Sequence, residues 1–132
     1  MGKKGYKDLV VWQKGKNLAI LVYRTTREGD LNRDLGLRDQ LRRSAVSIAS
    51  NIAEGDERDS DKEAVRFFYV AKGSLAELRT QIEISYEIGY LRKEDYEIID
   101  GECVSLAKMI GSLIKARRKG SLLSSKPKAS SP

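Results

Sequence analysis

The chain has 132 residues, of which 40% are hydrophobic and 33% charged, enough for one soluble domain with its own core. It contains no histidine and one cysteine, Cys103, which excludes the usual zinc sites, Ser-His-Asp triads and Cys-His pairs. We therefore expect no enzyme activity, no metal and no cofactor. The two prolines lie far from the middle, so long helices are not interrupted.

The net charge of +6 is unevenly distributed. Residues 115–132 hold six cations and no acid, residues 1–16 carry a net charge of +4, and residues 17–114 carry −4. The basic character therefore lies at the two ends of the chain. Such ends are either nucleic-acid-binding arms or solvated termini.

Nothing in the sequence indicates a membrane or a secreted protein. The apolar run Leu9–Trp12 is too short for a signal peptide or a membrane span. Met1-Gly2 does not continue as a myristoylation motif, because Tyr6 stands where Ser or Thr is needed. A single cysteine forms no internal bridge. We expect a cytoplasmic protein with no membrane partner.

Four segments are predicted to be helices separated by short breaks. Gly29-Asp30 ends the first, Gly55 is expected to cap the second in a left-handed conformation, and Ser60 with Glu63 forms a capping box for the third. The expected helices are residues 8–28, 34–55, 60–89 and 93–120. The domains are then a basic lead at 1–7, a helix bundle at 8–118 and a disordered Ser/Lys/Pro-rich tail at 119–132.

Apolar residues alternate in steps of three and four along these helices, which is typical of bundle seams. Short connections make neighbouring helices antiparallel, so the predicted fold is an all-α, antiparallel up-down-up-down four-helix bundle. Pairing Leu41 with Leu75 places Ile48 against Phe68, and the next pair of helices places Leu75 near Ile110. The expected seam residues are Val11, Leu18, Val22, Leu41, Ala45, Ile48, Ile52, Phe68, Ala71, Leu75, Leu78, Ile82, Tyr96, Ile99, Cys103, Leu106, Ile110 and Leu113.

The second helix contains an unusual Ser- and Ala-rich stretch, Gln40–Ile48 followed by Asn51–Gly55. These segments, with Tyr6–Lys14, Ala71–Leu78 and Gly89–Leu91, resemble the bacterial family named for proteins encoded in 23S rRNA intervening sequences. The resemblance spans about residues 6–116. It departs at Gly29–Leu35, where the family usually has a Phe-Pro pair followed by a glutamate, and this puts the path of that loop in question.

The resemblance implies an antiparallel four-helix bundle that assembles into homopentameric rings, with RNA binding inferred mainly from gene context. A distantly related branch is the accessory variability determinant of diversity-generating retroelements, which binds a reverse transcriptase and nucleic acid. The expected partners are therefore further copies of the chain, RNA or DNA, and in the alternative a reverse transcriptase. The rRNA-associated branch is the better match.

Polar residues of the motif have a structural and a functional interpretation. In the predicted register Arg42 and Arg43 lie level with Ser74 and Glu77, so they either fix the helices to one another or meet phosphate. The inter-helix polar motif comprises Arg43, Asn51, Glu54, Ser74 and Glu77. The carboxylates between Glu54 and Glu63 are compatible with a divalent cation but are more typical of a solvated turn.

In a bundle of four helices both chain ends lie at one pole, which would gather their cations. The candidate nucleic-acid-binding residues are Lys7, Lys14, Lys16, Arg42, Arg43, Lys115, Arg117, Arg118 and Lys119. Aromatic residues such as Phe68 and Tyr86 are expected in the core or a subunit interface, and Trp12 suits either role. We predict a non-enzymatic, oligomeric nucleic-acid-associated protein; the alternative is a scaffold that docks a protein partner.

Overall fold

The computed structural model describes residues 5–130, and the side chains of residues 5–120. Its elements are the short 3-10 helix η1 (Tyr6–Asp8) and the helices α1 (Val10–Thr25), α2 (Gly29–Arg33), α3 (Leu35–Asp56), α4 (Asp61–Glu87) and α5 (Lys93–Ser130). The expectation of an all-α chain is confirmed for this part of the sequence.

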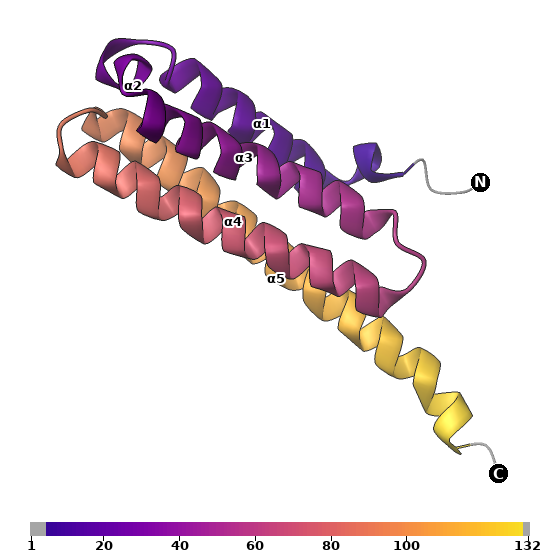
Figure 1. Cartoon of the computed structure of the whole chain (residues 1–132). Coiled ribbons are helices and arrows are strands. Elements are labelled where there is room, and N and C mark those ends of the chain that lie inside the picture. The colour runs from indigo at the N-terminus through magenta and orange to yellow at the C-terminus, as the bar shows by residue number, and fades with distance from the viewer. Residues whose placement is uncertain (1–4, 131–132) are drawn as a thin grey trace.

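The four long helices lie side by side (Figure 1). Helix α1 packs against α3 and α5, α3 packs against α4, and α4 packs against α5. Consecutive long helices run in opposite directions, and the short α2 lies at the turn between α1 and α3 (Figure 1). The start of α1, the α3–α4 turn and the far end of α5 therefore share one end of the molecule.

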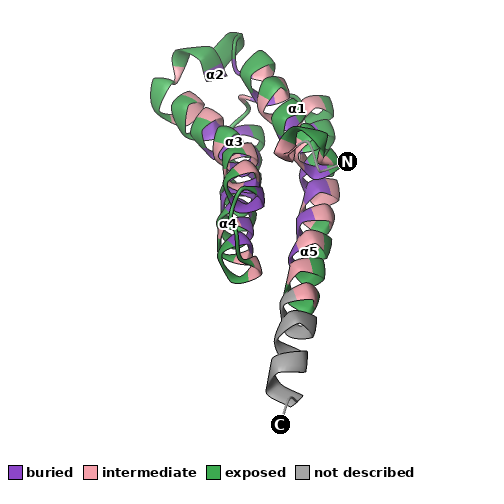
Figure 2. Ribbon diagram, turned by 90° about the vertical axis from the view of Figure 1, so that its right-hand side faces the viewer, coloured by how far each residue is buried: buried purple, intermediate pink, exposed green. Residues whose placement is uncertain are grey.

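The predicted seams form the core. Leu75 is 2% exposed and Ile110 is fully buried, as are most of the other expected seam residues. Only Tyr96 and Leu113 are half-buried, and they pack against the core from its edge. The buried positions face inward between the helices (Figure 2). Burying these side chains is the main source of stability for helices of this kind.

The helix starts follow the sequence signals. The Asp34 carboxylate accepts a hydrogen bond from the Leu37 N–H at 3.1 Å, and the Ser60 hydroxyl accepts one from the Glu63 N–H at 3.1 Å. Both side chains satisfy an amide that has no partner within its own helix. The Glu63 side chain forms an ion pair with Arg66 and, among the described residues, no hydrogen bond with the Ser60 N–H, so only the serine half of the expected capping box forms.

Two expected features around α1 and α3 are wrong. Gly55 is not a left-handed cap, since α3 continues through it to Asp56. The glycine is needed for packing: an added Cβ would lie 2.5 Å from Cε1 of Phe68. The first helix was expected to reach Glu28 and end in a short break, but α1 ends at Thr25. Residues Gly29–Arg33 form the additional helix α2, whose Leu31 is buried in the core.

The predicted α3–α4 register is displaced by more than one helical turn. Ser74 lies beside Ser47, with 2.8 Å between the two hydroxyl oxygens, and not beside Arg42 and Arg43. Phe68 correspondingly reaches Gly55, two turns beyond Ile48. Successive turns of a seam offer similar apolar residues, so spacing alone does not select among registers.

Helix α5 is longer than expected, because it continues past Gly120 to Ser130. A glycine costs only about 1 kcal/mol in a helix interior, so Gly120 by itself does not end the helix. The expected end near Gly120 is therefore wrong. The predicted disorder of the 119–132 tail falls largely on residues 121–132, whose side chains lie outside the described part, so that assignment stays a prediction.

Candidate nucleic-acid interface

The two ends of the bundle sequence meet at the α3–α4 turn, as the four-helix topology requires. An added Cβ at Gly5 would lie 3.7 Å from Oε2 of Glu57, and one at Gly120 would lie 3.4 Å from Oδ2 of Asp61. Three of the candidate cations at this end, Lys7, Lys115 and Lys119, have exposed side chains. Arg118 is also exposed and donates a hydrogen bond to the Tyr69 hydroxyl at 3.0 Å.

Arg117, one of the candidate cations, is held by contacts within the protein. Its guanidinium donates to Asp61 at 3.0 Å and to Asp56 at 3.4 Å, and it lies over the ring of Phe68. These contacts tie α5 to the end of α3 and the start of α4. The side chain of Asp56 is only 2% exposed, so the pair is largely shielded from solvent. Arg117 is thus engaged within the protein and does not present a free cation.

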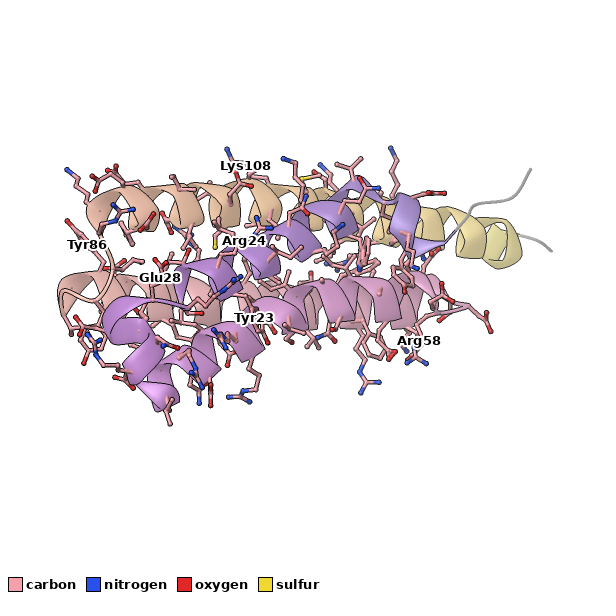
Figure 3. The ribbon with its side chains drawn as sticks, turned by 90° about the horizontal axis from the view of Figure 1, so that it is seen from above. Tyr23, Arg24, Glu28, Arg58, Tyr86 and Lys108 are labelled. Carbon is pink, nitrogen blue, oxygen red and sulfur yellow. The ribbon has the colours of Figure 1, made fainter. Side chains whose placement is uncertain are left out.

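Acidic side chains share this end of the molecule with the basic ones. Glu54 pairs with Arg58 at 3.2 Å, while Glu57 and Asp59 are exposed beside them. Arg58, labelled at the α3–α4 turn in Figure 3, lies over the Phe67 ring of α4, with 4.5 Å between the guanidinium carbon and the ring centre. Within residues 5–120, no three His, Cys, Asp or Glu side chains are placed to hold a metal ion. The turn is therefore a mixed-charge surface.

Arg42 and Arg43 do not lie beside Ser74, and their side chains contact different groups. Arg42 Nε donates to the Thr26 hydroxyl at 2.9 Å, and its guanidinium lies 4.5 Å from the centre of the Tyr23 ring. It joins α3 to the end of α1. Arg43 is exposed and donates to Gln40 within α3. Of the two, Arg43 is the one whose charge faces solvent.

The predicted inter-helix polar motif is correct in part. Ser74 contacts Ser47 across α3 and α4, and the Asn51 amide donates to the Ser47 hydroxyl at 3.0 Å and to its carbonyl at 2.8 Å. Together they form a short hydrogen-bonded chain at the interface. Arg43 and Glu54 bond only within α3 or its following turn. Glu77 is exposed and makes no hydrogen bond or ion pair with the described side chains.

A groove that the sequence analysis did not identify lies between α1 and α3. Its volume is about 610 Å³. Aromatic and aliphatic side chains line it, together with three cations and no acid. These lining residues include Tyr6, Trp12, Lys16, Ile20, Tyr23, Arg24, Arg27 and Val46. Figure 3, which looks onto the molecule from above, labels Tyr23 and Arg24.

The groove is shallow, because α1 and α3 approach each other closely beneath it. An added Cβ at Gly15 would lie 3.6 Å from both Cα and Cβ of Ala49. Small residues on α3, among them Ala49, Ser50 and Ala53, leave the space that the larger residues of α1 surround. The candidate Lys16 lies at the groove, 5.6 Å from the Trp12 ring centre, whereas Lys14 is exposed outside it.

The sequence does contain a signal for this groove. Residues 9–27 hold four cations, Lys14, Lys16, Arg24 and Arg27, and no acid. Trp12, Lys16, Ile20, Tyr23 and Arg27 also recur at steps of three and four, which places them on one side of a helix. This second stripe lies beside the buried one.

A second hollow, of about 480 Å³, lies between α4 and α5 near the opposite end. Ile84 and Ile88 line it with exposures of 47% and 53%, next to Glu83 and Glu87. Arg79 of α4 and Asp100 of α5 also line the hollow, and Arg79 Nε donates a hydrogen bond to the Asp100 carboxylate at 2.9 Å. This hydrogen bond raises the pKa of the Arg79 guanidinium. The hollow is apolar with an acidic margin.

Cys103 is fully buried in the core. Burial, aided by the nearby Asp100, raises the pKa of its thiol to about 12. A thiol in this state is neutral at ordinary pH, and only the thiolate is a nucleophile. The residue is a core side chain.

No helix in the described part of the chain is long and apolar enough to cross a membrane.

These observations define an all-helical protein with a cationic, aromatic groove on one side and an apolar hollow on another. A comparison with protein families matches residues 7–112 to the family described as 23S rRNA-intervening sequence protein. The chain belongs to that family, as its sequence motifs indicated.

A comparison with solved structures supports the same fold. The chain is similar, with a TM-score of 0.74 and 24% identity, to a protein of unknown function from the S23 ribosomal protein family of Bacteroides thetaiotaomicron. The match covers 80% of this chain and 99% of that one. At this identity the likeness concerns the fold. A comparison with curated protein sequences gives no match.

Proposed function

We propose that the protein is a non-enzymatic, nucleic-acid-associated bundle that binds RNA through its phosphates. The observation that carries this proposal is the uncompensated charge of α1 and its following turn. Residues 9–27 hold four cations and no acid. None of the four takes part in an ion pair with a described side chain. Cations arranged in this way attract a polyanion without selecting its sequence.

The exposed Lys7, Lys115 and Lys119 extend this cationic surface at the end where α1 begins. Glu57 and Asp59 lie at the same end and weaken its field, so the first contacts are assigned to α1. Membership of a family named for 23S rRNA intervening sequences supports RNA as the nucleic acid.

The test is the salt dependence of RNA binding, measured by fluorescence anisotropy. Raising salt from about 50 to 200 mM should weaken binding steeply, because each neutralised phosphate releases counterions. The double variant Lys14→Ala/Lys16→Ala should lower the slope of log K against log salt by about 1–2.

Lys108→Ala is the matched control, because Lys108 is exposed on α5 away from α1 (Figure 3). It should leave the slope close to that of the wild type. The proposal is wrong if RNA does not bind at low salt or if binding is insensitive to salt.

A second candidate function is a protein-docking scaffold, and the α4–α5 hollow favours it. Exposed isoleucines in a hollow with an acidic margin are typical of a protein contact. The occupant on this proposal is a further copy of the chain, in a ring of antiparallel up-down-up-down bundles such as a homopentamer, or a partner such as a reverse transcriptase.

Ile88→Asp should then lower the molar mass measured by light scattering, or abolish copurification of one stoichiometric protein after nuclease treatment. Ile98→Asp, which changes a similarly exposed isoleucine outside the hollow, is the control. Equal behaviour of the two variants would remove this candidate.

A further inference from the structure

The groove between α1 and α3 has walls of two different chemical kinds. Trp12, Ile20 and Tyr23 from α1 and Val46 from α3 provide apolar and aromatic surface. Ile20, Tyr23 and Val46 are each 40–42% exposed, a large fraction for side chains of this size. A groove with these walls accommodates a planar, partly apolar group.

The charged residues of the groove are all cationic. Lys16, Arg24 and Arg27 line it, and no Asp or Glu does. Arg24 and Arg27 form no ion pair with a described side chain, and the Lys16 ammonium lies over the face of Trp12, 5.6 Å from the ring centre. The groove therefore complements a ligand that carries repeated negative charges.

The aromatic rings are held in position by their neighbours. The Trp12 ring meets the Tyr6 ring edge-on, with 5.0 Å between centroids. Tyr23 is supported by the Arg42 guanidinium, which Thr26 fixes through a hydrogen bond. Rings that are already ordered lose little conformational entropy when a planar group stacks on them.

The groove is long enough for several nucleotides. Trp12 and Arg27 are separated by fifteen residues of chain that is mostly helical, which spans about 22 Å at the helical rise. Along this length aromatic residues alternate with cations, in the order Trp12, Lys16, Tyr23 and Arg24. This combination is the one by which proteins bind single strands: bases stack on rings while the backbone follows the positive charge.

We propose that this groove binds a single-stranded segment of nucleic acid, with bases against Trp12 and Tyr23 and phosphates at Lys16, Arg24 and Arg27. The proposal rests on the proposed function and specifies its site. A duplex would meet the same cations, but its bases are stacked internally and do not reach apolar walls. The groove thus favours unpaired strands.

Trp12 provides a direct measurement, because it is the single tryptophan of the chain. A single-stranded oligouridylate of about 12 nucleotides should quench its fluorescence in a saturable manner. The same strand annealed to oligoadenylate should quench it less and bind at least several-fold more weakly. Inorganic polyphosphate, which has charge but no bases, should not produce the stacking quench.

The matched variants are Ser50→Phe and Ser112→Phe. Ser50 lines the groove on α3, whereas Ser112 is exposed on α5, so each introduces the same ring at an exposed helical position. Ser50→Phe fills the groove without changing charge and should weaken single-strand binding about tenfold. Ser112→Phe should bind as the wild type does. Circular dichroism checks that both are folded.

The outcomes separate this proposal from the general one. Absence of RNA binding by anisotropy would overturn the proposed function. Salt-sensitive RNA binding with no Trp12 quenching, no preference for single strands and no effect of Ser50→Phe would leave that function standing and overturn the groove. A change in molar mass on Ser50→Phe, without a change in binding, would assign the groove to a contact between copies and also overturn the proposal.

Discussion

Gly55 and Phe68 are in direct contact across α3 and α4, at a separation that leaves no room for a side chain on the glycine. A Cβ added at Gly55 would lie 2.5 Å from Cε1 of Phe68 and 2.9 Å from the Ala64 carbonyl oxygen. The phenylalanine ring is fully buried, so it has little freedom to move aside. The end of α3 is held against the start of α4 by this contact.

We expect Gly55→Ala to lower the free energy of unfolding by about 1–3 kcal/mol, because the added methyl overpacks the core. Chemical denaturation measures the change. Gly73→Ala is the control: Gly73 is helical and exposed, and an added Cβ has nothing within 4 Å. It should stabilise the protein by about 0.5–1 kcal/mol. Equal effects of the two substitutions would contradict the contact.

The Ser47–Ser74 hydrogen bond is expected to contribute through its place in a partly buried chain of polar groups. Ser74→Ala removes one partner of Ser47 and should cost about 1 kcal/mol. In a double-mutant cycle, Ser47→Ala and Ser74→Ala together should cost less than the sum of the single changes, because both break one interaction. Additive effects would show that the hydroxyls are not coupled.

Arg117 is expected to matter for stability, whereas its neighbour Arg118 is not. Arg117→Ala removes two charge-assisted hydrogen bonds, one of them to the shielded Asp56, and should lower the unfolding free energy by about 2 kcal/mol. Arg118→Ala changes an exposed side chain and should stay within about 0.5 kcal/mol of the wild type. Thermal denaturation of the two variants decides this; a larger loss for Arg118→Ala would contradict the assignment.

Ionisation of Cys103 is expected to lower the free energy of unfolding at high pH. Its folded pKa is raised to about 12 from an ordinary value of 9.0, so the folded protein retains the proton longer than the unfolded chain does. This contribution is fully present below pH 9.0 and is lost as the pH rises toward 12.

Comparison with Cys103→Ala isolates the effect, since other groups titrate equally in both proteins. The wild type should lose stability more steeply above pH 9.0 than the variant. A thiol reagent should also modify the native protein slowly at neutral pH and rapidly after denaturation. Parallel pH profiles, or rapid modification of the native thiol, would count against the buried environment.

The sequence was a good guide wherever a structural feature depends on one helix alone. The buried seams follow from a period of 3.6 residues, and Ser60 caps α4 because its hydroxyl reaches an amide three residues away. Features that depend on two helices were harder to predict. Gly55 is chemically suited both to a left-handed cap and to a close contact, and only the position of Phe68 decides between them.

The candidate site shows the same distinction. Counting cations near the ends gave Lys7, Lys14 and Lys16 as candidates, and the structure shows their side chains exposed, but the count did not distinguish Arg117 from Arg118. The carboxylates that engage Arg117 belong to other helices and are brought to it by the fold. The groove depends on two helices, because small residues of α3 leave the space beside Trp12 and Tyr23 of α1, and the sequence of α1 alone does not show that space.

The proximity of Gly5 and Gly120 to one turn makes the chain suited to circular permutation. A short linker between these two glycines would close the backbone, and new termini placed in the turn between Glu87 and Lys93 would leave α1, α3 and α4 intact and α5 intact as far as Gly120. The rearranged protein would have its free ends beside the α4–α5 hollow. A fluorophore or an affinity tag attached there would report on that tip, while the cationic face of α1 would remain unobstructed.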